Sequence, residues 1–81
     1  KRITRKLKLD SWVKEFGNND KGKCPIKNCS ELLCKNNIND WHAGHIISEK
    51  NWGETTIHNL RPICCDCNRA MGSMNWDEYD S

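Results

Sequence analysis

Six of the 81 residues are cysteine, and no other feature of the sequence limits the possible folds as strongly. A domain of this length buries only about 60–65% of the surface that its unfolded chain exposes, so hydrophobic burial alone leaves it marginally stable. The apolar content of 36% is also below the ~45–50% that is usual for a globular domain. A single domain over residues 1–81 therefore needs a covalent or metal cross-link, and the cysteines can supply it.

The cysteines are expected to bind a metal rather than to form disulfides. The sequence has no apolar run near the ~20 residues of a membrane span, and no signal peptide at its start. Without a secretory signal, cysteines act first as metal ligands or thiols. We therefore expect an intracellular protein that is neither secreted nor bound to a membrane. Because the chain starts at Lys1 without a methionine, we also expect it to be excised from a larger protein.

Four of the cysteines form two pairs with the spacing of zinc ligands. Four residues separate Cys24 from Cys29, and two separate Cys64 from Cys67 at the start of an expected helix. Tetrahedral Zn²⁺ accepts four thiolates from two such loops. The sequence predicts one structural zinc on these four residues, with a disulfide pair or free thiols as the alternative.

Cys34 and Cys65 leave two ligand assignments open. Cys34 could replace Cys29, since Cys24, Cys29 and Cys34 are evenly spaced along the chain. Cys65 could likewise replace Cys64. We favour Cys29 because it closes the shorter loop. We favour Cys64 because it alone keeps the two-residue spacing to Cys67.

Hydrophobic periodicity predicts a small α+β domain. Four apolar residues recur at the spacing of one helical face: Leu9, Trp12, Val13 and Phe16. The expected elements are a helix over 9–16, strands over 41–47 and 56–63, a helix from Cys64 that Gly72 ends, and a last helical turn within 73–79. Residues 30–40 are ambiguous between a loop and a helical turn. The zinc-bound core would span 24–74, after a basic arm over 1–8.

Charge is distributed unevenly along the chain. Residues 1–27 hold nine Lys and Arg against three Asp and Glu, whereas residues 28–81 hold four against eight. A basic arm on an acidic body indicates a polyanionic partner at one end of the molecule. The expected contacts in this arm are Lys1, Arg2, Arg5 and Lys6.

Three segments follow one another in a recognisable order. They are Trp41-His42-Ala43-Gly44-His45-Ile46, then Asn59-Leu60-Arg61-Pro62-Ile63-Cys64, and finally Cys67-Asn68. This order resembles the zinc-containing HNH endonucleases, which have the ββα-metal (His-Me finger) fold. The resemblance covers residues 12–79, and residues 44–74 are most similar to HNH domains of large DNA viruses. It implies DNA as the partner, and the cytoplasm, the nucleus or a viral factory as the compartment.

The resemblance also implies roles for three residues. His45 would be the general base that activates water, and Asn59 would fix the loop that orients it. Asn68 would bind the catalytic cation, for which Mg²⁺ or Mn²⁺ is expected because an amide oxygen is a hard ligand. The implied reaction is hydrolysis of DNA phosphodiester bonds that leaves 5′-phosphate and 3′-hydroxyl ends.

One position departs from the family pattern. Many HNH domains carry Asp, Glu or His just before the base, where this chain has Gly44. Either Asn68, water and substrate phosphate hold the cation, or another residue supplies a ligand. His42 or Asp40 would do so if the chain bends next to Gly44, and Asp66 lies in the first turn of the helix. The alternative function is a non-catalytic, zinc-containing DNA-binding or structural module with a degenerate site.

The remaining expectations concern DNA contacts. Arg61 and Arg69 flank the expected site and could contact phosphate, or they could be plain surface charges. Trp52 lies in a polar loop where it could stack on a base, whereas the other tryptophans are expected in the core. Four thiolates and one Zn²⁺ take the formal charge from +2 to about zero. Affinity for DNA must therefore come from local charge, and a homodimer would be needed to cut both strands.

Overall fold

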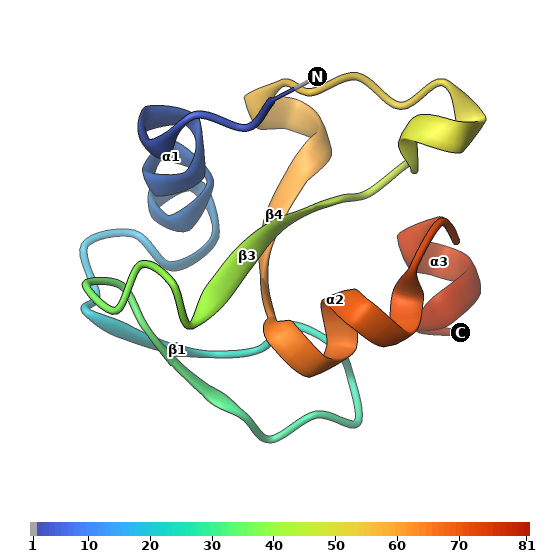
Figure 1. Ribbon diagram of the computed structural model, residues 1–81. Helices are drawn as coiled ribbons and strands as arrows, with labels where there is room; N and C mark the ends of the chain where they lie inside the picture. Colours follow the sequence, from blue (N-terminus) through green and yellow to red (C-terminus); the bar gives the residue numbers. More distant parts are fainter. Residues whose placement is uncertain (1) are drawn as a thin grey trace.

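The computed structural model describes residues 2–81, and Lys1 lies outside them. Two antiparallel hairpins and three helices make up the domain (Figure 1). In chain order the elements are α1 (Arg5–Phe16), β1 (Lys21–Lys23), β2 (Leu32–Cys34), β3 (Trp41–His45), the 3₁₀ turns η1 (Glu49–Asn51) and η2 (Ile57–Asn59), β4 (Leu60–Cys64), α2 (Cys65–Met71) and α3 (Trp76–Tyr79). The predicted α+β class is confirmed.

Helix α1 begins four residues earlier than the sequence predicted. Thr4 is its N-cap, and the Thr4 side chain accepts a hydrogen bond from the Leu7 backbone N–H at 3.1 Å. Gly17, with φ +64°, ends the helix as expected. The arm predicted over residues 1–8 is therefore partly wrong, because Arg5 and Lys6 lie on a helix that fixes their direction.

Strands β3 and β4 form the hairpin that precedes α2. The register runs from Trp41 opposite Cys64 to His45 opposite Leu60. Both strands are shorter than predicted, because η2 forms before β4 and the chain leaves the ladder after His45. Gly72, with φ +54°, ends α2 where the sequence placed it. The order β3, β4, α2 is the ββα arrangement that the resemblance implies.

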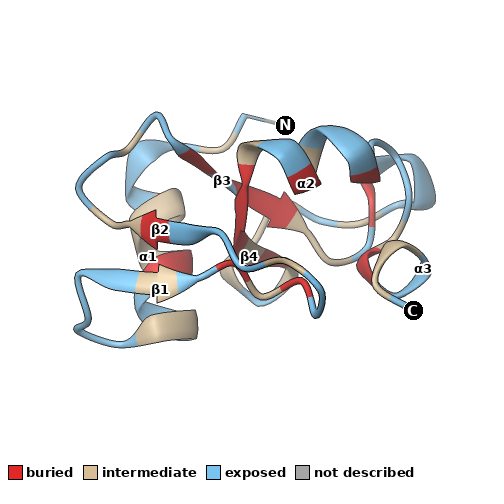
Figure 2. Ribbon diagram, turned by 90° about the horizontal axis from the view of Figure 1, so that it is seen from below, coloured by how far each residue is buried: buried red, intermediate tan, exposed pale blue. Residues whose placement is uncertain are grey.

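Helices α1 and α2 lie on opposite faces of this hairpin. The rings of Trp12 on α1 and Trp41 on β3 are 5.0 Å apart. A side chain at Gly44 would instead point towards Asn68 and Met71 on α2, as alternation along a strand requires. The buried residues concentrate between these layers (Figure 2). The tryptophans at 12, 41 and 76 are buried, as expected.

The first hairpin and the C-terminal helix extend this core. Pairing of β1 with β2 was not predicted, since the sequence indicated no element over residues 21–23 and was ambiguous over 30–40. Asn75 caps α3 in a capping box with Glu78, which confirms the expected last helical turn. Within residues 2–81, no helix is long and apolar enough to span a membrane.

Candidate functional site

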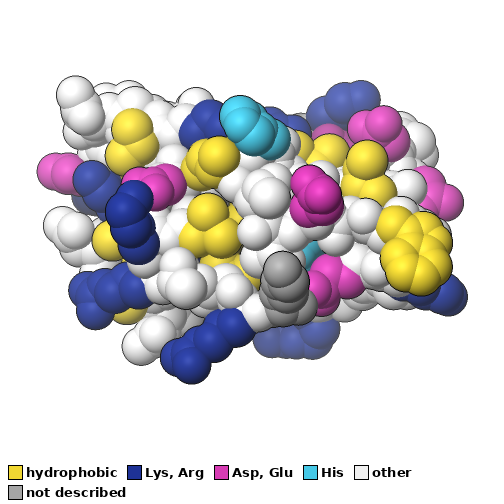
Figure 3. Space-filling view, turned by 90° about the horizontal axis from the view of Figure 1, so that it is seen from above, with side chains coloured by type: hydrophobic (Ala, Val, Ile, Leu, Met, Phe, Trp, Pro, Cys, Tyr) yellow, Lys and Arg dark blue, Asp and Glu magenta, His cyan; other side chains and the backbone are white. Residues whose placement is uncertain are grey.

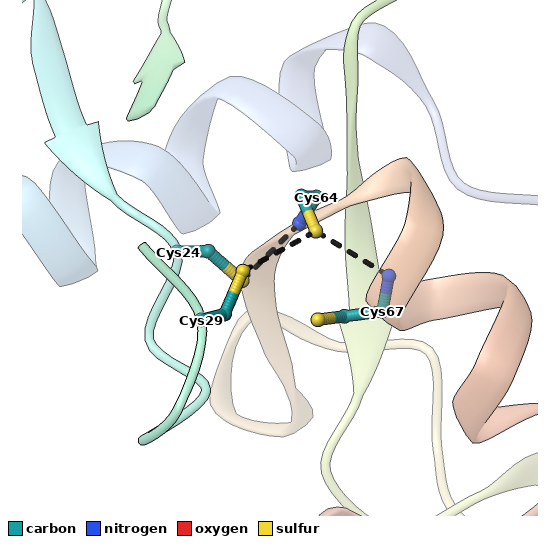
Figure 4. Close-up of side chains that lie close together, drawn as sticks. All are labelled: Cys24, Cys29, Cys64 and Cys67. Carbon is teal, nitrogen blue, oxygen red and sulfur yellow. Dashed lines mark hydrogen bonds between the residues drawn. The ribbon is translucent and has the colours of Figure 1, made fainter. Parts of the chain in front are cut away.

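Four cysteine sulfurs gather where the first hairpin meets the start of α2. Cys24 and Cys29 come from the loop between β1 and β2, Cys64 ends β4, and Cys67 lies in the first turn of α2 (Figure 4). All four Sγ atoms lie within 4.8 Å of one another. The predicted ligands therefore meet at one point, although Cys29 and Cys64 are 35 positions apart in the chain.

The spacing of these sulfurs fits a tetrahedral zinc ion. Zn–S bonds of about 2.3 Å place two ligand sulfurs about 3.8 Å apart, and Cys29 Sγ lies 3.8 Å from Cys64 Sγ. All six cysteines are free thiols, and a disulfide would need sulfurs about 2.05 Å apart. The cluster could hold zinc, and it contains neither Cys34 nor Cys65. The ligand choices made from spacing are therefore the ones that the geometry supports.

Backbone groups orient the cluster. The Cys64 N–H donates to Cys24 Sγ at 3.5 Å, and the Cys67 N–H donates to Cys64 Sγ at 3.3 Å. The Lys23 ammonium donates to three carbonyls around the first pair: those of Cys24 (2.7 Å), Ile26 (3.2 Å) and Cys29 (2.6 Å). Lys23 therefore stabilises the ligand loop, a role that its place in a basic run did not indicate.

Burial makes two of the four cysteines unfavourable sites for a bare thiolate. Loss of solvent raises the pKa of Cys67 to about 12 and also raises the pKa of Cys24. At Cys29, a hydrogen bond from the Glu31 backbone has the largest effect and lowers the pKa. Without a cation, Cys24 and Cys67 keep their protons at neutral pH, and a bound metal must displace them.

The second candidate site is a cleft of about 340 Å³ at the His45 end of β3. β3 contributes His42, Ala43, Gly44 and His45, the turn after it contributes Ser48, Glu49 and Lys50, and α2 contributes Asn68 and Met71. His45 is half-buried, and its Nε2 forms a hydrogen bond with Thr55 Oγ1 at 3.0 Å. This contact leaves Nδ1 as the ring nitrogen that can act on a water molecule.

Asn59 holds the loop that follows His45. Its Oδ1 accepts from the Ile47 N–H at 2.9 Å, and its Nδ2 donates to the carbonyls of Ile47 (3.0 Å) and Glu54 (2.8 Å). The Asn59 carbonyl also accepts from the Ile46 N–H at 2.9 Å. One amide thus fixes both ends of the turn that carries Thr55, the partner of His45. The loop-fixing geometry expected of Asn59 is present.

Asn68 lines the cleft from α2, opposite Gly44 on β3, which has no side chain. A Cβ built on Gly44 would lie 3.5 Å from Asn68 Oδ1 and 3.1 Å from Ile63 Cγ2. Within residues 2–81 the Asn68 side chain makes no hydrogen bond, so its amide oxygen is available to a ligand. The empty side-chain position at Gly44 points at the oxygen to which the family resemblance assigns a cation.

Of the extra ligands considered, only His42 lines the cleft. β3 pairs with β4 without a break through Gly44, so the bend that would bring Asp40 into the site is absent. Asp40 lies at the opposite end of β3, and Asp66 is exposed and paired with Arg69 at 3.4 Å. Burial lowers the pKa of His42, and Lys8 and Arg69 lower it further. His42 is therefore neutral near pH 7, the form that binds metals.

Arg61 is engaged within the fold rather than free to contact DNA. Its Nε and one terminal nitrogen donate to the two Glu15 carboxylate oxygens at 2.9 and 3.0 Å. The guanidinium also lies 4.6 Å from the ring centroid of Trp76. These contacts assign Arg61 a structural role instead of a phosphate contact, because its side chain joins β4 to α1 and α3. No spacing rule relates residues 46 positions apart, so the sequence held no signal for this pair.

Lys50 lines the cleft itself, and further basic residues lie near it at the chain start. Ile3 lines the cleft, so Arg2 and the first turn of α1, with Arg5 and Lys6, lie beside it. Arg2, Arg5 and Lys6 are exposed, although Lys6 pairs with Asp10 at 2.8 Å. Figure 3 looks onto this end of the molecule, where Lys and Arg side chains are denser on the side of α1. Arg69 is also exposed. Charge that could meet a phosphate backbone therefore adjoins the cleft.

We expect Glu15→Ala to lower the free energy of unfolding by about 1.5–3 kcal/mol, because it leaves the partly buried Arg61 guanidinium without its charged partner. Chemical denaturation of the zinc-loaded protein measures the change. Lys6→Ala, which removes an exposed pair on the same helix, is the matched control and should change stability by no more than about 0.5 kcal/mol. Equal effects for the two variants would contradict the structural role of Arg61.

Sequence reasoning missed two residues at the site, one that contacts His45 and one that lines the cleft. Thr55 contacts His45 directly, and Glu49, at the start of η1, lines the cleft. Neither belongs to a recognisable motif, and only the loop that Asn59 closes brings Thr55 back to the strand end. A threonine in a polar loop carries no local signal for such a contact.

Comparison with known proteins gives one match. The family model described as HNH endonuclease matches residues 24–73, more than half of the chain. This range includes both cysteine pairs, His45, Asn59 and Asn68. Searches of curated proteins and of solved structures find no significant match.

Proposed function

The chain belongs to the HNH endonuclease family, and on that premise we propose that it is a divalent-cation-dependent endonuclease that hydrolyses DNA phosphodiester bonds. The observation that supports this best is that one cleft contains both His45 and the Asn68 amide. A base and a cation ligand on two rigid elements are what hydrolysis of a phosphodiester by water requires.

His45 acts on the attacking water in this proposal. The contact between Nε2 and Thr55 fixes the ring, and Nδ1 accepts the proton of a water in line with the scissile bond. Asn59 acts through position, because it closes the turn that carries Thr55. The leaving group is the 3′ oxygen, so the products carry 5′-phosphate and 3′-hydroxyl ends.

The catalytic cation would be held by Asn68 on α2. Neutral His42, which lines the same cleft from β3, would be a second ligand. Mg²⁺ is the proposed ion, with Mn²⁺ as a substitute, because Mg²⁺ keeps several waters and needs few protein ligands. When bound, the ion stabilises negative charge on the phosphate and on the leaving oxygen.

The cysteine cluster would hold a structural Zn²⁺ that fixes the start of α2. Asn68 directly follows the ligand Cys67, so the zinc would also fix the direction of the cation ligand. The proposed partner is DNA, met by Arg2, Arg5 and Lys6 beside the cleft. The closer likeness of residues 44–74 to HNH domains of large DNA viruses, an intracellular location and assembly as a homodimer or within a larger protein remain predictions.

Supercoiled plasmid tests the reaction and its products. We expect the zinc-loaded protein to nick the plasmid only when Mg²⁺ or Mn²⁺ is added, and DNA ligase to reseal the nicks, because ligase requires 5′-phosphate and 3′-hydroxyl ends. Nicks that ligase cannot close would contradict the proposed bond cleavage.

The second candidate is a DNA-binding or structural module without catalysis. Gly44 favours it, since the position that faces Asn68 has no side chain to offer a cation. Such a module would hold zinc and bind DNA but would leave supercoiled plasmid intact at any Mg²⁺ concentration.

Gly44→Asp probes the same position. We expect the added carboxylate to reach the cation beside Asn68 and to lower the Mg²⁺ concentration for half-maximal nicking several-fold. Gly44→Ala is the matched control, because its methyl group meets Ile63 Cγ2 at the same 3.1 Å without offering a ligand. A Mg²⁺ titration in which the two variants behave alike would contradict a cation at Asn68.

A further inference from the structure

The turn that lines the cleft also carries the most exposed aromatic side chain of the described residues. Trp52 is 92% exposed, whereas Trp12, Trp41 and Trp76 are at most 3% exposed. Trp52 is also the one residue other than glycine in 2–81 with a positive φ, at +70°. The left-handed conformation costs free energy for any residue with a Cβ. Folding therefore gains nothing from an indole at this position, which points to a role in binding.

The backbone holds Trp52 in a fixed position. Its N–H donates to the Glu49 carbonyl at 3.0 Å, and the Gly53 N–H donates to the Ser48 carbonyl at 2.9 Å. A Cβ at Gly53 would lie 1.7 Å from the Ile47 carbonyl oxygen, so only glycine permits this close turn. An indole on such a support loses little conformational entropy when it binds a flat partner.

The same turn adjoins the reacting groups. Ser48, Glu49 and Lys50 line the cleft together with His45, and Trp52 follows two residues later. If a DNA phosphate is bound at His45, the neighbouring nucleotides of that strand would lie against this turn. Lys50 lines the cleft, where an ammonium can meet phosphate, and the exposed indole two residues later can meet a base.

We propose that Trp52 stacks on an unpaired nucleobase beside the scissile phosphate, so that the protein prefers single-stranded or locally unpaired DNA to intact duplex. This inference rests on the proposed nuclease function. Both faces of a base in a duplex are covered by its neighbours, and exposing one face costs free energy. A base that is already unpaired offers its face to an aromatic side chain without that cost.

Fluorescence and affinity test the proposal in the zinc-loaded His45→Ala protein, which should bind DNA without cutting it. Since Trp52 is the one exposed tryptophan, a single-stranded oligonucleotide should quench its emission, and an all-abasic strand of equal length should not. Trp52→Gly should weaken binding of the oligonucleotide about 5- to 150-fold, while Trp52→Phe retains most of the affinity. Leu32→Ala removes another exposed apolar side chain, on β2, and should leave the affinity unchanged.

The thermal stability of the Trp52→Gly protein is a second readout, because it should rise while the affinity for DNA falls. Glycine relieves the left-handed conformation, so Trp52→Gly should raise the melting temperature by about 4–8 °C while it weakens binding. A Trp52→Gly protein that binds the strand as tightly as its parent overturns the proposal, as does equal loss of affinity for strand and duplex. The nuclease proposal survives either result if the wild type nicks plasmid. A wild type that neither nicks nor binds DNA overturns both.

Discussion

Replacing Cys67 with serine is expected to unfold the domain under conditions in which the zinc-loaded wild type is folded. Cys67 is buried at the start of α2, and its sulfur lies within 4.8 Å of the three other sulfurs. Structural zinc contributes about 10–16 kcal/mol to the folding of small zinc domains, which equals or exceeds the whole stability of a typical domain, about 5–15 kcal/mol. A hydroxyl is a poor zinc ligand, so most of that contribution should be lost.

Circular dichroism and metal analysis of the purified proteins measure this effect. The wild type should carry about one zinc per chain and unfold when a strong chelator removes it. Cys34→Ser and Cys65→Ser are the matched controls, because both residues are partly buried cysteines outside the cluster, and both variants should keep zinc and fold. A folded Cys67→Ser protein, or unfolding of either control, would show that the ligand set is wrong.

His45→Ala is expected to lower the rate of DNA cleavage about 10²- to 10⁴-fold, the usual contribution of a general base. The residue is half-buried at the end of β3 and lies outside the hydrophobic core. The variant should therefore fold and keep its zinc. Single-turnover cleavage of a labelled oligonucleotide with saturating protein reports the chemical step separately from binding.

Two further measurements distinguish a base from a structural histidine. Imidazole added to the His45→Ala protein should restore part of the rate, because it can take the water proton in the vacated space. His58→Ala is the control, since His58 is exposed in η2, and its rate should match the wild type. Unaltered cleavage by His45→Ala, or equal losses at both histidines, would exclude His45 as the base.

The sequence predicted the parts of this protein that depend on short-range spacing. Cys64 and Cys67 lie one helical turn apart, and their separation alone identified them as a ligand pair. Gly17 and Gly72 ended helices where expected, because positive φ angles favour glycine. His45 and Asn68 reach one cleft because β4 returns antiparallel to β3 and leads directly into α2.

What the sequence did not predict depends on contacts between distant segments. Arg61 was considered as a phosphate contact or a plain surface charge, but it pairs with Glu15, 46 positions away, once α1 packs on the hairpin. Thr55 reaches His45 only because Asn59 closes the intervening loop. The hairpin of β1 and β2 has three residues in each strand, too few for a periodic pattern to show. Asp40 could be a cation ligand only if the chain bent next to Gly44. The presence of a glycine does not show whether a strand bends there, and the structure shows that it does not.

The most direct test of the central claim is the initial nicking rate of supercoiled plasmid in Mg²⁺, measured side by side for zinc-loaded wild type and His45→Ala. We predict that the wild type converts supercoiled plasmid to the nicked form and that His45→Ala, equally folded and equally loaded with zinc, is at least about 100-fold slower. If both folded proteins leave the plasmid supercoiled, or if both nick it at the same rate, the account of His45 as the base of a DNA-cleaving site is wrong.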